Sequence, residues 1–380
     1  MKMTRIALGL IGAVGLCSPA LAENGVTKDE IVIGAFLPLQ SGLAAGAAQV
    51  RDGALAYAQH INDQGGINGR KIKWLTENDS YNPQQAVAAT RKLVDRDEIF
   101  AVVSPLGTVT AMAVLPYLVQ KNIPMIGPVV GSPKLLEPTD RVVFGVLPSG
   151  VTRGKAVAQH AVEEMKGKSI AVFSQNDDFG KDVRDGAVEY LKSKGMSIAA
   201  EASYAPNDAD MSSQVAKLRA ANPDVVVLAG IPKPLSLFIN EAAKQGWKPK
   251  YVGPSQLTDP LMVELSGDNV NGTEIIYDVA LQNSPAASEA NAILAKYAPQ
   301  TRPGYFAYNG MIGMMLFAEA VKRAGTEPTR EKVITELEKL QQFKSGIFPP
   351  ISYAPNNHAG VKTFGVAKWE NGKLEMVKGW

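Results

Sequence analysis

The chain of 380 residues contains a single cysteine, Cys17, and only three histidines. One thiol cannot form a disulfide within the chain, so the fold depends on a large hydrophobic core. The histidines, His60, His160 and His358, show no metal-ligand spacing, and the zinc motif HExxH is absent. The motifs GxGxxG, GxxxxGK[ST] and GxSxG are absent too. We therefore predict no metal site, no cofactor and no enzymatic activity.

Long apolar runs are rare, and one of them lies at the N-terminus. Two basic residues precede an apolar core over residues 6–16, and Ala20–Ala22 has the A-x-A pattern of a signal-peptide cleavage site. The apolar core is too short to span a membrane. A lipoprotein signal is disfavoured because Leu16, which is not small, precedes Cys17. We predict a cleaved signal peptide, residues 1–22, and a periplasmic protein.

The chain also lacks an excess of charge of either sign. It has 39 Lys and Arg against 37 Asp and Glu, a formal net charge of +2. Lys2 and Arg5 lie in the predicted signal peptide, so the mature chain is neutral. A neutral chain gives no reason to expect nucleic acid or anionic lipid as a partner. Hydrophobic residues make up 46% of the sequence, as in ordinary globular proteins, and the length suffices for two domains.

Strand-like and helix-like segments alternate over residues 31–280, in two successive series. The predicted strands cover residues 31–39, 71–79, 99–103, 123–130, 169–175, 196–204, 223–230 and 250–256. Alternating strands and helices imply parallel sheets covered by helices on both faces. The sequence thus predicts an α/β fold with two doubly wound lobes, whose ligands bind beyond the carboxyl ends of the strands.

One strand end combines a glycine with two hydroxyl side chains. The stretch "SPLGTVTA", residues 104–111, follows the apolar run "IFAVV" and precedes a segment with helical spacing. Gly107 permits the turn, and Thr108 and Thr110 stand at the start of the helix. Free backbone N–H groups and hydroxyls at such a turn suit an anion.

Several stretches in order resemble one protein family. They include "IVIGAFLPLQSG", "GALAYAQHINDQGGINGRKI", "NDSYNPQQAVAATRKLV", "NIPMIGP", "DDFGKDVRDGAVEYLKSKG" and "PNDADMSSQVAKLRAANPDVVVLAG". Together they resemble the solute-binding proteins of branched-chain-amino-acid-type ABC importers, which have the type I periplasmic binding protein fold. The resemblance implies two lobes joined by a three-segment hinge, with a ligand cleft between them that closes by hinge motion.

This resemblance also implies boundaries and partners. Chain crossings are expected near residues 144–149, 277–282 and 343–351. The N-terminal lobe is then residues 26–146 plus 281–345, and the C-terminal lobe is residues 147–280 plus 346–380. The implied partners are a small-molecule ligand and an ABC permease in the inner membrane, and the protein is expected to be a monomer. A ligand-dependent sensor or receptor domain, with an amide- or urea-type ligand, is the alternative role.

In amino-acid-binding members of the family, the turn equivalent to residues 104–111 holds the ligand α-carboxylate, and Thr108 takes the hydroxyl position. The positions that would hold the α-amino group fall on Gly131 and Ser255, neither of which supplies a negative charge. We therefore expect a small apolar or aromatic carboxylate without an amino group. If Asp178 or Gln256 binds an ammonium group, the ligand is a branched-chain or other apolar amino acid.

The walls of the ligand cleft are also expected to include the aromatic ring of Phe179 in "DDFG" and side chains near the later strand ends. The predicted ligand-binding residues are Leu106, Gly107, Thr108, Thr110, Val129, Val130, Gly131, Phe179, Ile231, Ser255, Gln256 and Tyr308.

Overall fold

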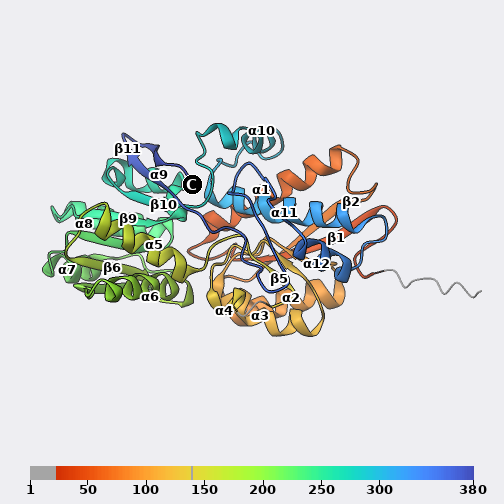
Figure 1. Ribbon diagram of the computed structural model, residues 1–380, viewed down its shortest axis with the longest axis horizontal. Coiled ribbons are helices and arrows are strands. Elements are labelled where there is room, and N and C mark those ends of the chain that lie inside the picture. Colours follow the sequence, from red (N-terminus) through yellow and green to blue (C-terminus); the bar gives the residue numbers. More distant parts are fainter. Residues whose placement is uncertain (1–22, 138–139) are drawn as a thin grey trace, which may run out of the picture.

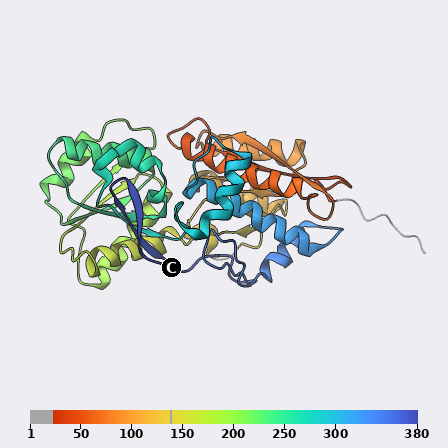
Figure 2. The same cartoon turned by 90° about the horizontal axis from the view of Figure 1, so that it is seen from above.

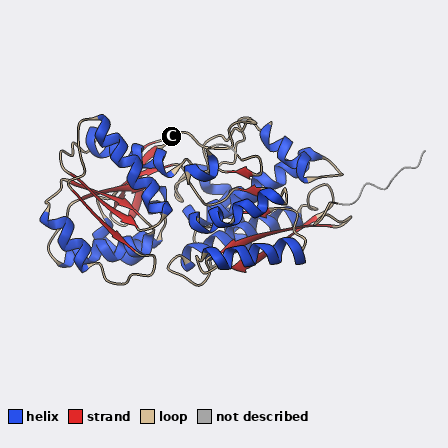
Figure 3. Cartoon of the chain, turned by 90° about the horizontal axis from the view of Figure 1, so that it is seen from below, coloured by secondary structure: helices blue, strands red, loops and turns tan. Residues whose placement is uncertain are grey.

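The computed structural model describes residues 23–137 and 140–380, so the predicted signal peptide lies outside the described residues. The chain forms two α/β lobes that lie side by side along the long axis of the molecule (Figure 1). In each lobe, helices cover both faces of a sheet (Figure 3). This arrangement confirms the predicted two-lobed α/β fold.

The first lobe is built on a parallel five-stranded sheet in the order β2-β1-β3-β4-β5. Its last helices come from a later part of the chain, shown in light blue in Figure 1. The elements of this lobe are β1 (Glu30–Leu37), α1 (Ala44–Asp63), β2 (Lys71–Asn78), α2 (Pro83–Arg91), η1 (Lys92–Arg96), β3 (Val102–Val103), α3 (Thr108–Gln120), β4 (Met125–Ile126), α4 (Pro133–Leu136), β5 (Val143–Phe144), η4 (Pro285–Ala287), α10 (Ser288–Tyr297), α11 (Tyr305–Ala324) and α12 (Arg330–Glu338).

The second lobe has a seven-stranded sheet in the order β12-β11-β10-β9-β8-β6-β7. Strands β6 to β10 pair in parallel, whereas β11 and β12 form an antiparallel hairpin at one edge. Figure 2 shows this C-terminal hairpin, in dark blue, on the second lobe. The elements are α5 (Gly150–Glu163), β6 (Ile170–Gln175), α6 (Asp178–Ser193), β7 (Ala200–Tyr204), α7 (Ser212–Ala220), β8 (Val225–Ala229), α8 (Pro232–Lys244), β9 (Lys250–Pro254), η2 (Ser255–Thr258), α9 (Leu261–Ser266), η3 (Gly267–Val270), β10 (Glu274–Tyr277), β11 (Gly365–Glu370) and β12 (Lys373–Lys378).

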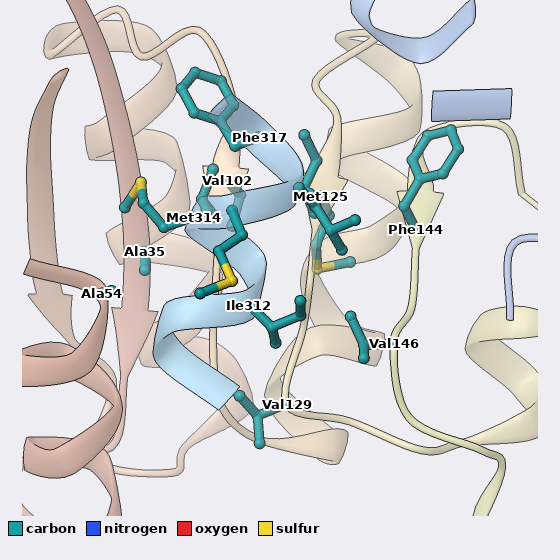
Figure 4. Packing of buried hydrophobic residues seen from close by; sticks show 14 of the residues in the cluster. Ala35, Ala54, Val102, Met125, Val129, Phe144, Val146, Ile312, Met314 and Phe317 are labelled. Carbon is teal, nitrogen blue, oxygen red and sulfur yellow. The ribbon is translucent and has the colours of Figure 1, made fainter. Parts of the chain in front are cut away.

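Helix α11 is the centre of the first hydrophobic core. Sixteen of its 20 residues are buried, because it packs both on the sheet and on α1. Figure 4 shows Ile312, Met314 and Phe317 of this helix beside Val102 of β3 and Met125 of β4. A helix that is apolar around most of its circumference must be enclosed by other elements, and α11 therefore fixes the first lobe as one body.

Three chain segments connect the lobes and pair with one another. The N–H of Val361 donates to the carbonyl of Val146 at 2.9 Å, and that of Ala280 donates to Ile347 at 2.8 Å. The third segment differs from the expected boundary at residue 346. Apolar side chains from this segment are buried in the first core instead of the second: Ile347, Phe348, Ile351, Tyr353 and Val361. Their burial keeps the chain on the first lobe for about 15 residues longer.

Candidate functional site

A pocket lies at the junction of the two lobes, beyond the carboxyl ends of β3, β6, β8 and β9. This is the position in which doubly wound sheets bind ligands. Residues of the first lobe form most of the wall, and three residues of the second lobe complete it. The lining residues are Leu43, Tyr81, Leu106, Gly107, Thr108, Val129, Tyr305 and Phe306 from the first lobe, and Phe179, Ile231 and Gln256 from the second.

The structure brings together seven of the twelve predicted site residues. Although distant in sequence, these seven residues meet at the pocket: Leu106, Gly107, Thr108, Val129, Phe179, Ile231 and Gln256. Their contacts with a ligand stay predictions.

The other five predicted residues do not line the pocket. Thr110 donates its hydroxyl to the Gly107 carbonyl at 3.2 Å, and Ser255 donates to Asp278 Oδ1 at 2.6 Å. Tyr308 is fully buried in the first core and donates to Asn291 Oδ1 at 2.5 Å. Val130 is also part of that core, and the Gly131 carbonyl accepts a hydrogen bond from the N–H of Gly150.

Four lining residues were not among the predicted site residues: Leu43, Tyr81, Tyr305 and Phe306. Tyr305 and Phe306 are the first two residues of α11, and Leu43 immediately precedes α1. Tyr81 follows the end of β2. The sequence does contain a signal for Tyr81. It is an aromatic residue just past a predicted strand end, and the neighbouring strand ends carry most of the other site residues.

The turn before α3 requires its glycine. Gly107 has φ +129°, and a Cβ at this position would lie 2.5 Å from Thr110 Oγ1 and 3.0 Å from the Tyr81 ring. The turn is fixed at its other end because the N–H of Val129 donates to the Pro105 carbonyl at 2.8 Å. The peptide groups of Leu106 and Gly107 are thereby held at the pocket wall.

Helices α3, α6, α8 and α11 all begin at the pocket. Helix N-termini carry partial positive charge and unpaired N–H groups, which attract anions. In α6 this end is already occupied, because Asp177 Oδ1 accepts from the N–H of Gly180 at 3.1 Å. In α8, Pro232 and Pro234 have no N–H, and the N–H of Ile231 donates to Tyr204 Oη at 3.0 Å.

The remaining two helices, α3 and α11, have no side-chain cap at their N-termini, where Thr108 and Tyr305 are the first residues. At α11 the buried Asp259 carboxylate lies close to the helix start, since a Cβ at Gly304 would be 3.2 Å from its Oδ2. A carboxylate at this position disfavours a second anion. The N–H groups of the first turn of α3 are therefore the donors best placed for a ligand anion.

Ionised side chains do not line the pocket. The lining side chains with polar groups are Thr108, Gln256 and the two tyrosines, Tyr81 and Tyr305. Gln256 Nε2 donates to the Gly230 carbonyl at 3.0 Å, and its Oε1 is buried and has no hydrogen-bond partner among the described residues. Most of the wall is aromatic or aliphatic, so the pocket favours an apolar ligand body.

A buried ion pair lies behind this wall. Arg153 Nη2 is 3.0 Å from Asp278 Oδ2, and both side chains are at most 3% exposed. Ser255 donates to the other oxygen of Asp278. Burial raises the pKa of Tyr305, and the positive charge of Arg153 opposes that rise. The charges compensate each other within this group, so the second-lobe side of the pocket carries no net charge from it.

Residues 23–137 and 140–380 contain no group of three or more His, Cys, Asp or Glu side chains arranged to hold a metal ion. In the same ranges no helix has the length and hydrophobicity to cross a membrane.

Comparison with known proteins places this geometry in context. A family model described as "Periplasmic binding protein" matches residues 30–373. The Leu/Ile/Val-binding protein homolog 3 of Brucella melitensis biotype 1 is 26% identical over 369 residues, which cover 97% of each chain.

Two solved structures share the fold. The fatty acid ABC transporter substrate-binding protein from Thermomonospora curvata superposes with a TM-score of 0.86 at 20% identity, over 94% of this chain and 93% of that one. The branched-chain amino acid transporter substrate binding protein from Streptococcus pneumoniae, solved in complex with isoleucine, superposes with a TM-score of 0.81 at 22% identity. The match covers 92% of this chain and 100% of that one. Because the family model matches most of its length, the chain belongs to the periplasmic binding protein family.

Proposed function

We propose that this protein is the extracytoplasmic solute-binding component of an ABC importer and that it captures a small apolar or aromatic carboxylate between its lobes. The observation that carries the ligand assignment is the uncapped N-terminus of α3 in a pocket without ionised lining side chains. The N–H groups and the Thr108 hydroxyl hold the carboxylate, and the aromatic walls enclose the apolar body. The protein then delivers the ligand to a membrane permease, and it acts as a monomer in the periplasm.

The close approach of the walls restricts the size of the ligand. The free space between them is about 40 Å³, well below the range of about 300–1,000 Å³ typical of small-molecule sites. A compact acid with one ring or a short branched chain therefore requires less rearrangement of the walls than a long acyl chain does. The fatty-acid name of one structural relative supports carboxylates as a class, whereas the small pocket argues against the longer members of that class.

A branched-chain amino acid is the second candidate, favoured by the names of the sequence relatives. An α-amino group in the pocket needs acceptors, and burying an unpaired ammonium group is costly. Among the lining side chains, Gln256 Oε1 offers a neutral acceptor. A neutral amide compensates a buried ammonium group less well than a carboxylate does, and for this reason we place the amino acid second.

Calorimetric titration of the mature protein with benzoate and with leucine tests this order. We expect benzoate to bind more tightly; tighter binding of leucine would refute the ligand assignment. Thr108→Val should weaken benzoate binding about tenfold or more, since hydrogen bonds to charged groups contribute about 1.5–3 kcal/mol. Thr108→Ser should restore most of the affinity, whereas Thr363→Val, at an exposed position in a loop, should leave it unchanged. Equal affinities for the wild type and the Thr108→Val variant would remove Thr108 from the site.

A further inference from the structure

We propose that Tyr81 determines how tightly the cleft holds its ligand, because its ring forms part of the pocket wall while its hydroxyl fastens the first lobe to Asp177 of the second. The Tyr81 hydroxyl donates to Asp177 Oδ2 at 2.8 Å. The identity of the ligand rests on the proposed function above, but the bond between the lobes does not.

The backbone at Tyr81 is held in an unfavourable conformation. Ser80 has φ +49° and Tyr81 has φ +59°, in the left-handed region that bulky residues avoid. Two side chains stabilise this turn: Asn78 Oδ1 accepts from the N–H of Ser80 at 3.1 Å, and Asp79 Oδ1 accepts from the N–H of Tyr81 at 2.8 Å. Such strain persists only where the surroundings over-determine it, and it concentrates at functional sites. Here its effect is to direct an aromatic ring at the pocket.

Asp177 has two functions that the geometry separates. Its Oδ1 caps α6, the helix that carries the pocket residue Phe179. Its Oδ2 accepts from Tyr81 Oη and also from Gln175 Nε2, at 2.5 Å. One carboxylate therefore orients a wall of the second lobe and binds a wall of the first.

The hydrogen bonds continue to a second pocket residue. Gln175 Oε1 accepts from Tyr204 Oη at 3.1 Å, and Tyr204 Oη accepts in turn from the N–H of Ile231 at 3.0 Å. Gln175 and Tyr204 are at most 1% exposed. The chain of bonds thus links Tyr81 to Ile231 across the cleft. Charge-assisted bonds within a buried network are stronger than isolated surface bonds, so the bond contributes chiefly to the lifetime of the closed cleft.

The test removes the two functions of Tyr81 separately. Tyr81→Phe keeps the ring and removes the bond between the lobes, and Asp177→Asn keeps a good helix cap but loses the charge that strengthens the bond. With benzoate as the probe, we expect each variant to raise the dissociation rate about tenfold in stopped-flow measurements. The double variant should be little worse than either single variant, because the two residues act through one bond. Additive losses, or an unchanged rate in Tyr81→Phe, would overturn the proposal.

Tyr190→Phe is the matched control. Tyr190 also donates to a carboxylate, Glu163 Oε1 at 2.6 Å, but here the donor and the acceptor both lie in the second lobe. We expect this variant to release benzoate at the wild-type rate. If Tyr190→Phe released benzoate as fast as Tyr81→Phe does, the loss of any tyrosine–carboxylate bond would loosen the cleft. That result would refute the specific function of Tyr81.

A spin-label measurement separates this proposal from the ligand assignment. Residues 23–380 contain no cysteine, so Gln84→Cys and Ser193→Cys, both exposed and in different lobes, can be labelled selectively. Without any probe, Tyr81→Phe should shift the distance distribution between the labels toward more open forms. If neither benzoate nor leucine binds the wild type, the ligand assignment fails while this comparison still decides the function of Tyr81. Identical distributions in the two proteins would overturn it.

Discussion

Asp79, at the base of the Tyr81 turn, offers a sharp test of how the site is built. Its side chain is fully buried, and burial raises the pKa of the carboxyl group from 3.8 to about 6, although the N–H of Tyr81 donates to it. Each tenfold change in proton affinity corresponds to about 1.4 kcal/mol, so ionised Asp79 destabilises the folded chain by about 3 kcal/mol at neutral pH. Asp79→Asn keeps an oxygen for Tyr81 and removes the charge.

The pH dependence of this effect has a definite sign. A raised pKa means that the folded state binds the proton more tightly than the unfolded state does. The penalty is therefore complete above about pH 6 and disappears as the pH falls toward 3.8. We expect Asp79→Asn to raise the free energy of unfolding by about 3 kcal/mol at pH 7.5 and to change it little at pH 4.

Urea titrations of the wild type and the variant at both pH values measure this difference. Asp29→Asn, at an exposed position, is the control and should show no comparable difference. A gain in stability that is the same at both pH values would refute the reasoning, since it would not arise from the charge of Asp79. A loss of stability at both would mean that the ionised form holds the Tyr81 turn better than an amide does.

Two further substitutions test the remainder of the site. Gly107→Ala places a Cβ against Thr110 and the Tyr81 ring at φ +129°, so we expect a loss of about 1–3 kcal/mol in unfolding free energy and much weaker benzoate binding; unchanged calorimetric titrations would contradict this. Arg153→Met leaves Asp278 buried without its cation, which should reduce the unfolding free energy by about 3–5 kcal/mol and lower the thermal midpoint. A midpoint equal to that of the wild type would show that this pair does not stabilise the fold.

The two-lobed α/β fold could be predicted from the sequence because its signals are local and repeated. Apolar runs such as β8 (Val225–Ala229) are buried throughout, and helices with one apolar face follow them. The extent of the strands was harder to predict. Residues 123–130 were expected to form one strand, but β4 covers only Met125–Ile126. Pro124 and Pro128 flank it and lack the N–H that a sheet requires.

Most pocket residues that follow a strand end could be predicted, whereas those at the starts of α1 and α11 could not. Tyr305 and Tyr308 occupy the same helix and the same core, but only Tyr305, the first residue of α11, also borders the pocket. Tyr81 depends on a left-handed backbone and on a carboxylate 96 positions away in the sequence. No periodic pattern encodes such a pairing, which arises only when the two lobes meet.

The pocket walls are formed by residues at or beside the ends of helices and strands. Four of them also belong to the hydrophobic core of the first lobe: Leu106, Val129, Tyr305 and Phe306. Others, such as Leu43, Phe179 and Ile231, belong to none of the hydrophobic cores, and changes there can alter ligand preference with little effect on core packing. Leu43, Phe179 and Ile231 project from separate element ends, so a combinatorial library at these three positions would vary the recognised compound with little change to the framework. The same three positions make the chain a suitable starting point for engineered binding proteins, in which new recognition is combined with an unchanged two-lobed scaffold.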